Sequence, residues 1–270
     1  MTDPRPLGVF DSGVGGLSVL AEIARELPAE PLVYLADSAH LPYGDKPAAY
    51  VRTRARACAA FLLDRGCKAV VVACNTATAA AVEDLRARIE VPIVAMEPAI
   101  KPAVQVTRSG VIGVLLTSGT ATSGRYVQLL ERHGNGVSVV TQTCPGLVER
   151  VEAGDVSSAQ TRALLEGYVT PLLARGADVL ILGCTHYPFL RPVLDQIVSA
   201  GVSVVDAGAA VARQVRRRLT DVGLLSTESA APEFWTSGDA QRFARIRARL
   251  YPCPAPGVIA PETVGEFTRA

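Results

Sequence analysis

The sequence predicts an α/β fold of two pseudo-symmetric open parallel-sheet domains, with a functional site in the cleft between them. Three observations predict this fold. Short apolar runs alternate along the chain with longer segments of helical periodicity. Several motifs of the first half recur in the second half in the same order. Polar side chains follow the matching apolar runs in both halves.

The apolar runs are rich in Val, Ile and Leu on consecutive positions, rather than on alternating ones. Strands of a parallel sheet are buried on both faces and have this composition. We therefore expect buried parallel strands at Leu7–Asp11, Leu32–Ala36, Ala69–Cys74, Pro92–Ala95, Val111–Leu116, Val137–Thr141, Val179–Gly183 and Val202–Asp206.

Segments rich in Ala, Leu and Arg lie between these runs. Their periodicity predicts helices that include Pro47–Arg65, Ala77–Arg88, Ser157–Arg175 and Ala207–Leu219. Alternating strands and helices imply right-handed crossovers and open parallel sheets. Such sheets bind ligands just beyond the carboxyl ends of their strands, so we expect the site there.

Three strand motifs are duplicated. Leu7–Gly13 resembles Ile112–Ser118, Ala69–Thr76 resembles Val179–His186, and Val91–Val94 resembles Val202–Val205, at offsets of 105, 110 and 111 residues. Because order and spacing are both nearly preserved, the chain reads as two related halves. We place the first boundary near Glu97–Pro102 and expect the last segment to return to the first half. The predicted domains are residues 1–97 with 207–270, and residues 98–206.

Composition narrows the class of protein. The 270 residues are 49% hydrophobic and 5% aromatic, with a formal net charge of +1. This balance provides no field that would attract nucleic acid or anionic lipid. No segment approaches the ~20 apolar residues that span a bilayer, and the opening residues lack the pattern of a secretory signal. We therefore expect a cytoplasmic protein.

The six cysteines contain no CxxC pair. A disulfide framework or a thiolate metal site is therefore not expected, and no metal is predicted. In the cytoplasm thiols remain reduced, so a special cysteine would act as a thiol.

Two cysteines occupy equivalent places in the duplicated halves. Cys74 and Cys184 each follow an apolar strand and precede a polar pair that begins a helix. A helix N-terminus favours a thiolate. A single cysteine at a strand end is more often simple packing, but the equivalent placement in both halves favours function. If the halves face each other across a cleft, the two sulfur atoms do too.

Two opposed thiols suit the inversion of an amino-acid stereocentre. A thiolate on one side can remove the α-proton as general base, while a thiol on the other side returns a proton as general acid. Groups that stabilise the developing carbanion, and the exclusion of water, would assist the transfer.

Residues Asp11–Gly16 form a glycine-rich turn after the first strand. Its backbone N–H groups could bind an anion such as a carboxylate. A simple tight turn or a nucleotide site is an alternative, but the turn lacks the GxGxxG spacing and a phosphate-binding lysine. Asp11 could contact a substrate ammonium group or support Cys74 as a base.

Six other residues are candidates, and structural roles are the alternative for them. Tyr43 and the backbone of Gly44, which follow Pro42, could contact substrate or form only a rigid turn. The hydroxyls of Thr117 and Thr120 could bind a carboxylate, although Thr120 could instead cap a helix. His186 could exchange a proton beside Cys184, and Glu152 is a weaker candidate because glutamate is usually exposed.

Together these motifs resemble the glutamate racemase family of the aspartate/glutamate racemase superfamily. The resemblance runs through nearly the whole chain. It is carried by Asp11–Gly16, Ala36-Asp37 with Pro42–Gly44, Cys74–Ala77, Gly183–Pro188 and Trp235–Asp239.

The resemblance implies a cofactor-free 1,1-proton transfer that interconverts L- and D-glutamate and supplies D-glutamate for bacterial peptidoglycan. It implies that Cys74 takes the proton from D-glutamate and Cys184 takes it from L-glutamate. Asp11, Glu152 and His186 match residues thought to assist the thiols, with Glu152 placed by its spacing from Cys144-Pro145. The matching substrate contacts are Asp11, Ser12, Tyr43, Gly44, Asn75, Thr76, Thr185 and His186. Members of the family are often dimers, which implies a homodimer.

Three alternatives remain open at this stage. The same scaffold could racemise aspartate or a hydantoin, since one methylene changes discrimination by only ~1–3 kcal/mol. A pyridoxal-phosphate racemase would need a Schiff-base lysine, whereas Lys68 precedes a strand and Lys46 and Lys101 are expected in loops. A non-catalytic amino-acid binding protein would give no reason for two symmetry-related cysteines.

Overall fold

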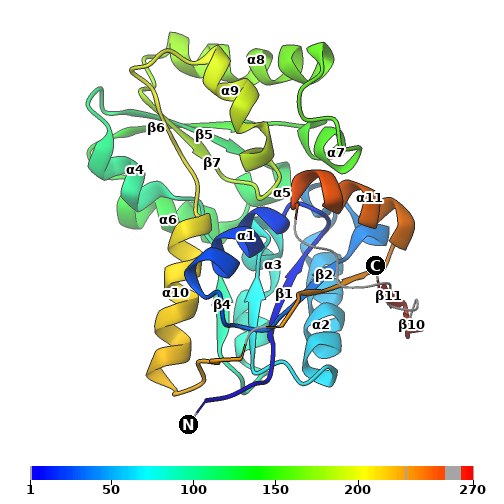
Figure 1. The fold of residues 1–270 in the computed structure, drawn as a ribbon. Helices are drawn as coiled ribbons and strands as arrows, with labels where there is room; N and C mark the ends of the chain where they lie inside the picture. Colours follow the sequence, from blue (N-terminus) through cyan, green and yellow to red (C-terminus); the bar gives the residue numbers. More distant parts are fainter. Residues whose placement is uncertain (1, 229, 253–262, 270) are drawn as a thin grey trace.

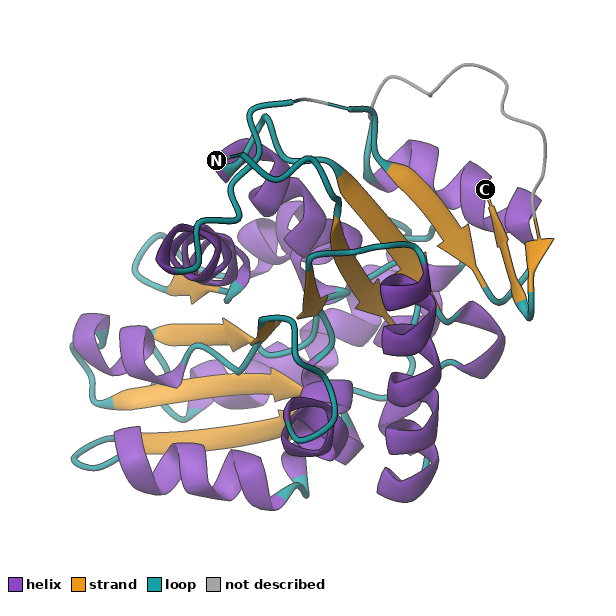
Figure 2. Ribbon diagram, turned by 90° about the horizontal axis from the view of Figure 1, so that it is seen from below, coloured by secondary structure: helices purple, strands orange, loops and turns teal. Residues whose placement is uncertain are grey.

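The computed structural model describes residues 2–228, 230–252 and 263–269. These residues form two sheets that lie one above the other in Figure 1, with helices packed against them. The larger sheet has seven strands in the order β10-β11-β9-β2-β1-β3-β4, and the smaller has four in the order β6-β5-β7-β8. In Figure 2 the arrows of the four-stranded sheet point toward the first sheet. The carboxyl ends of these strands therefore face the seam between the sheets.

The first sheet and its helices come from both ends of the chain. The N-terminal part comprises β1 (Leu7–Asp11), α1 (Leu17–Glu26), β2 (Leu32–Ala36), α2 (Ala48–Asp64), β3 (Ala69–Val72), α3 (Asn75–Arg86) and β4 (Ile93–Ala95). The C-terminal part comprises α10 (Gly208–Asp221), β9 (Glu233–Thr236), α11 (Ala240–Leu250), β10 (Thr263–Val264) and β11 (Phe267–Arg269). Helix α10 packs against α1 and β4, and β9 pairs with β2 in parallel (Figure 1).

The second sheet comes from the middle of the chain. Its strands are β5 (Val111–Leu116), β6 (Ser138–Thr143), β7 (Val179–Leu182) and β8 (Ser203–Val205). The helices are α4 (Ile100–Val106), α5 (Ser118–Ala121), α6 (Gly124–His133), α7 (Leu147–Glu152), α8 (Ala159–Ala174) and α9 (Arg191–Ile197). All eight predicted strands are present; three have the predicted bounds, and the ends of the other five differ by at most two residues.

The duplicated motifs pair in the same register in both sheets. Leu7 of β1 pairs with Ala69 of β3, and the equivalent residues Ile112 and Val179 pair in the second sheet. Likewise, β3 pairs with β4 in the same register in which β7 pairs with β8. The sequence duplication is therefore a duplication of structure down to single positions in the strands.

One edge of the first sheet differs from the expected parallel arrangement. β11 runs antiparallel to β9, and β10 runs antiparallel to β11. The ring of Phe267 packs against Phe61, which in turn packs against Trp235. These aromatic contacts hold the antiparallel edge on the core of the first sheet.

The core is continuous across the two sheets. One cluster of buried side chains includes Leu17 and Tyr34 from the first sheet and its helices, together with Leu115, Val151 and Leu180 from the second. Burial of this apolar area stabilises the arrangement of one half on the other.

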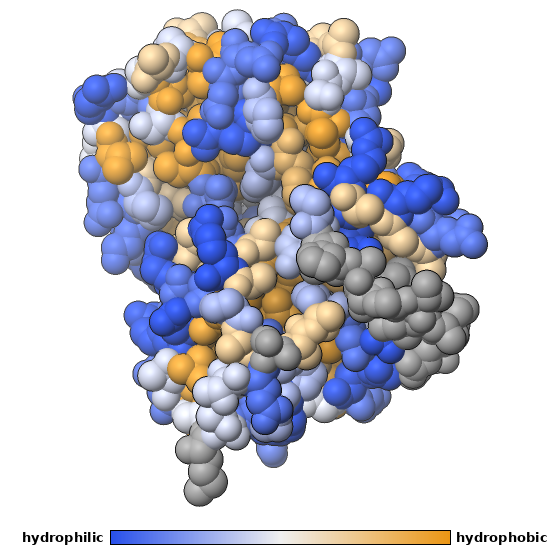
Figure 3. Space-filling model, in the orientation of Figure 1, coloured by the Kyte–Doolittle hydropathy of each residue, from blue (hydrophilic) through white to orange (hydrophobic). Residues whose placement is uncertain are grey.

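Among the described residues, no helix is both long and apolar enough to cross a membrane. Figure 3 shows hydrophilic and hydrophobic side chains intermixed on the face seen there.

Candidate active site

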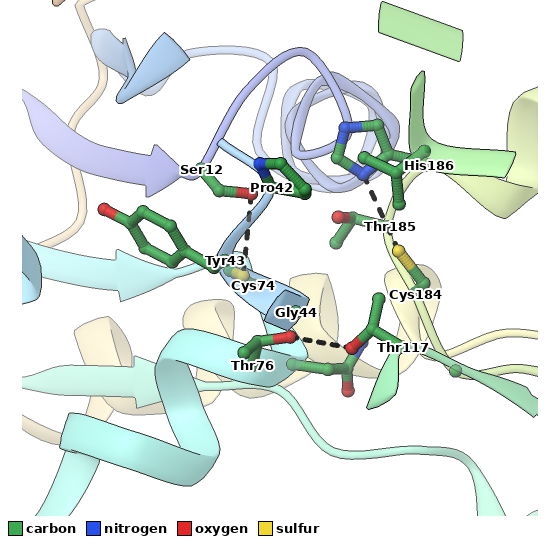
Figure 4. A pocket seen from close by; sticks show the side chains of 13 residues that line it. Ser12, Pro42, Tyr43, Gly44, Cys74, Thr76, Thr117, Cys184, Thr185 and His186 are labelled. Carbon is green, nitrogen blue, oxygen red and sulfur yellow. Dashed lines mark hydrogen bonds between the residues drawn. The ribbon is translucent and has the colours of Figure 1, made fainter. Parts of the chain in front are cut away.

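A small pocket lies in the seam between the two sheets. Its walls come from the segments that follow β1, β2 and β3 of the first sheet and β5, β6 and β7 of the second, which is the position expected for open parallel sheets. The lining residues are Ser12, Pro42, Tyr43, Gly44, Cys74, Asn75, Thr76, Thr117, Val148, Gly183, Cys184, Thr185 and His186. Figure 4 shows the sulfur atoms of Cys74 and Cys184 on two sides of this space.

Cys74 caps the N-terminus of α3, where the backbone N–H of Ala77 donates to its Sγ over 3.4 Å. The thiol lies 3.9 Å from the hydroxyl of Ser12, to which it can donate. Burial and the nearby Asp11 carboxyl raise the pKa of Cys74 well above its ordinary value, despite the Ala77 N–H. The N–H at the helix N-terminus does favour a thiolate at Cys74, as expected, but burial and a neighbouring acid outweigh it.

Asp11 lies behind the pocket wall and is fully buried. Its carboxylate accepts hydrogen bonds from the backbone N–H and hydroxyl of Ser12, at 2.5 and 3.1 Å, and from the hydroxyl of Thr185, at 2.9 Å. Burial raises the pKa of Asp11 against the lowering effect of His186 and these donors. Asp11 thus sits where it can act on Cys74, but it does not line the space that a substrate would fill.

Cys184 has a different set of neighbours. Its Sγ lies 3.6 Å from Nδ1 of His186, and Nε2 of His186 lies 2.6 Å from Oε1 of Glu152. Burial disfavours the charged imidazole, but the hydrogen bonds to Cys184 and Glu152 outweigh it and raise the pKa of His186 well above its ordinary value. Cys184 is followed by a short 3₁₀ turn over Tyr187–Leu190, whose N-cap is His186, rather than by the helix that its sequence suggested.

The glycine-rich turn binds carboxylates of the protein itself. The backbone N–H of Val14 donates to Oε1 of Glu152 over 2.8 Å, while that of Ser12 donates to Asp11. A Cβ atom on Gly13 would lie 1.8 Å from the Glu152 carboxylate. A Cβ on Gly15 would lie 2.3 Å from Nδ1 of His186. The anion expected at this turn is therefore present, but it is Glu152, and the glycines make room for Glu152 and His186.

Three threonine hydroxyls meet across the seam. Thr76 of α3 lies 2.9 Å from Thr117 and 3.1 Å from Thr120, and these two hydroxyls are 3.0 Å apart. Thr76 and Thr117 line the pocket, whereas Thr120 lies behind them. Thr120 is inside α5 and caps no helix, because Thr117 occupies the N-cap position.

The segment that carries Pro42, Tyr43 and Gly44 forms one wall, with a cis peptide bond between Leu41 and Pro42. The Tyr43 hydroxyl points away from the two cysteines in Figure 4 and donates to the carboxylate of Asp37. Burial, with Cys58 and Asp37 nearby, raises the pKa of Tyr43. Gly44 faces the second half, where a Cβ would meet Cβ of Thr117 at 2.8 Å.

Asn75 is the one buried side chain of the wall whose amide nitrogen and oxygen both lack a partner among the described residues. Burying an amide without hydrogen bonds costs roughly 1–3 kcal/mol in proteins. An amino acid has both donors and acceptors that could satisfy it.

The structure adds Val148 and Gly183 to the predicted wall and leaves Asp11, Thr120 and Glu152 behind it. The sequence could have pointed to Gly183, because this residue directly precedes Cys184. In the structure a Cβ at Gly183 would lie 2.2 Å from the side chain of Leu116. No sequence feature pointed to Val148.

No lysine lines the pocket. Lys68 is buried in an ion pair with Glu30, and Lys101 lies in α4 rather than in the expected loop. Within the described residues, no cluster of His, Cys, Asp and Glu could hold a metal ion.

Known proteins resemble the chain over most of its length. Residues 7–215 match the model of the Asp/Glu/hydantoin racemase family. A glutamate racemase of Stutzerimonas stutzeri is 58% identical, over 91% of this chain and 94% of that protein. A glutamate racemase isoform of Bacillus anthracis has a structure with a TM-score of 0.83 and 33% identity, covering 91% of this chain and 93% of the other.

The structure of Escherichia coli glutamate racemase, in complex with L-glutamate and the activator UDP-MurNAc-Ala, has a TM-score of 0.82 at 32% identity. The likeness covers 92% of this chain and 96% of that one. The chain therefore belongs to the glutamate racemase family of the Asp/Glu/hydantoin racemases, and it is an isomerase.

Proposed function

We propose that Cys74 and Cys184 are the acid and base of a cofactor-independent racemisation of glutamate. The observation that carries this proposal is the presence of two thiols, at equivalent positions of duplicated sheets, on two sides of one pocket. A thiolate on one side takes the α-hydrogen as a proton, leaving its electron pair on Cα. The thiol opposite gives its proton to the other face of Cα, so that thiol and thiolate have exchanged places after each turnover.

Polar groups of the wall would hold the substrate between the thiols. The unpartnered amide of Asn75 and the hydroxyls of Ser12, Thr76, Thr117 and Thr185 offer hydrogen bonds to its carboxylates and ammonium group. Hydrogen bonds in so small and buried a pocket act at low dielectric, and they would stabilise the negative charge that develops at Cα.

Asp11 and Glu152, from behind the wall, and His186, in the wall itself, assist the two thiols. We assign removal of the proton from L-glutamate to Cys184 and from D-glutamate to Cys74, following the family resemblance. The distance of 3.6 Å between Nδ1 of His186 and Sγ of Cys184 supports a role for His186 in moving protons at this thiol.

The wider setting follows from this activity. We propose that the enzyme supplies D-glutamate for peptidoglycan, and hence cell-wall biogenesis and cell shape, in the cytoplasm, where its thiols stay reduced. We further propose that it works as a homodimer, and that residues 1–97 with 207–270 and residues 98–206 are its two domains. The return of α10 and β9 to the first sheet supports this division.

The test is the circular dichroism of L-glutamate incubated in D₂O with purified protein and no added cofactor. We expect decay of the signal to zero with deuterium at the α-carbon. In the Cys74→Ala and Cys184→Ala variants the rate should fall by about 10²–10⁴-fold.

Cys67→Ala is the matched control, because Cys67 is equally buried but lies outside the pocket. Undiminished racemisation in either of the first two variants would contradict the two-thiol mechanism. Decay with aspartate but not with glutamate would change the substrate, and no decay with either would favour a binding protein.

A further inference from the structure

The wall segment around Tyr43 depends on a buried carboxylate outside the pocket. Asp37 follows β2, is fully buried, and accepts the hydrogen bond of the Tyr43 hydroxyl. A buried carboxylate is costly unless charge and hydrogen bonds compensate it. Whatever compensates Asp37 therefore also determines where Tyr43 sits in the wall.

Arg54 of α2 supplies that compensation. Its Nε and Nη2 donate to the two oxygens of Asp37 over 3.0 and 2.9 Å, a bidentate geometry that fixes the carboxylate in position and orientation. The Arg54 side chain is itself only 11% exposed. A guanidinium group has further N–H donors that a bidentate pair does not use. A second acceptor that binds one of them can fix the orientation of the guanidinium group.

Glu266, in the turn between β10 and β11, is that acceptor. Its carboxylate lies 2.9 Å from Nη1 of Arg54 and 3.6 Å from Nε2 of His40. His40 belongs to the same wall segment, two residues before Pro42, and its Nδ1 lies 2.6 Å from the Tyr50 hydroxyl. Glu266 thus contacts the wall segment directly through His40 and indirectly through Arg54 and Asp37.

A second contact joins the C-terminal part of the chain to the same segment. The backbone N–H of Ala39 donates to the hydroxyl of Ser237, just after β9, and the N–H of Ser237 donates to the carbonyl of Ala36. A Cβ on Gly238 would meet that of Ser38 at 3.0 Å. The Trp235–Asp239 motif therefore packs against the residues that lead into the wall.

We propose that Glu266 is a positioning residue for the substrate pocket, which acts through Arg54 and Asp37 to hold Tyr43 in place. The inference rests on the proposed function, in that the pocket is taken to bind glutamate. It assigns to the antiparallel C-terminal edge a role in substrate binding, although this edge contributes no side chain to the pocket wall.

A double-mutant cycle between Glu266→Ala and Tyr43→Phe tests the route of this effect. We expect Glu266→Ala to raise KM for L-glutamate about three- to tenfold with a smaller change in kcat, as coupled contacts of this kind permit. In the Tyr43→Phe background, where the hydroxyl is absent, Glu266→Ala should add little. Glu266→Gln retains an acceptor for Arg54 and should recover part of the loss.

Glu233→Gln provides the matched control. Glu233 belongs to β9 and pairs with Arg65 and Arg269 in the same part of the molecule, but none of these contacts leads to Tyr43. A KM for Glu266→Ala equal to that of the wild type, or fold-changes that multiply in the double variant, would overturn the proposal. So would an equal rise of KM in Glu233→Gln, because it would show a general effect of loosening the edge.

Failure of this inference is distinguishable from failure of the proposed function. Cys184→Ala, measured in the same series, reports on the two-thiol mechanism alone. If other groups exchange the proton, the KM values of the Glu266 and Tyr43 variants for L-glutamate can still be compared, because KM is measured on the substrate whichever groups act on it.

Discussion

The surroundings of Cys74 differ from those of Cys184, although the two cysteines occupy equivalent positions in sheets of the same strand register. Cys74 lies beside a hydroxyl and the buried acid Asp11, and its pKa is raised. Cys184 lies beside His186, whose pKa is raised by Cys184 and by Glu152. One thiol therefore has acidic neighbours, and the other has a cationic one.

The difference teaches that the duplicated fold provides equivalent positions for the two thiols, while the residues around them differ between the halves. Glu152 reaches His186 from α7, and it also binds Val14 of the other half. In the resting enzyme we expect Cys74 to hold its proton, because burial and the neighbouring Asp11 raise its pKa.

Single Cys→Ser variants should cause the largest loss of racemisation rate, and they test the difference between the two thiols directly. Each should lose racemisation by about 10²–10⁴-fold while the remaining thiol still removes a proton from one enantiomer. Cys74→Ser should exchange the α-hydrogen of L-glutamate with solvent, and Cys184→Ser that of D-glutamate. Mass spectrometry of each enantiomer in D₂O would measure the exchange. The reverse pattern would invert the assignment of the thiols.

A smaller loss of racemisation rate is expected from substitutions in the glycine-rich turn, which disturb the neighbours of one thiol at a time. Gly15→Ala would place its Cβ against His186 and Thr185, whereas Gly16→Ala would place it against Asp11 and Tyr34. A displacement near 1 Å can cost roughly 10²-fold in rate, so both variants should racemise far more slowly.

Gly167→Ala is the control for these glycine variants, because Gly167 is an exposed residue of α8 with open space around its Cα. It should leave the rate unchanged and stabilise the helix by up to ~1 kcal/mol. Normal activity in Gly15→Ala would show that the position of His186 does not matter for catalysis.

The smallest effect concerns stability as a function of pH. The folded protein binds the His186 proton more tightly than the unfolded chain does, so this stabilisation is complete below about pH 6.5 and is lost as pH rises through the folded pKa. Glu152→Gln should lower the free energy of unfolding by about 1–3 kcal/mol near pH 6, where a charged His186 loses its partner. Urea titrations should show this deficit shrinking at alkaline pH, and a constant deficit would argue against a charged His186.

Much of the fold follows from the sequence because parallel strands and helices leave local patterns. The run of Val and Ile before Cys74 and its counterpart before Cys184 predicted both the strands and the relation between the halves. β9 was not predicted, since Glu233–Thr236 is short and becomes a strand by pairing with β2, 200 residues earlier, and with β11. The antiparallel edge likewise depends on aromatic contacts among residues far apart in the chain.

The site residues were predictable where a reactive or polar residue type directly follows a predicted strand. Cys74, Asn75, Cys184 and Thr185 all line the pocket. The partner of the glycine turn was not predictable, because Val14 and Glu152 are separated by 138 residues. Nor was the raised pKa of Cys74, which depends on burial and on Asp11 rather than on the helix that it caps.

The unequal neighbours of the two thiols have a thermodynamic consequence. L- and D-glutamate have the same free energy in water, so no arrangement of His186, Glu152 or Asp11 can make the enzyme favour one product at equilibrium. The ratio kcat/KM must therefore be equal in the two directions. The asymmetry of the site can appear only as different KM values for the two enantiomers. The enantiomer with the lower KM then also has the lower kcat, by the same factor.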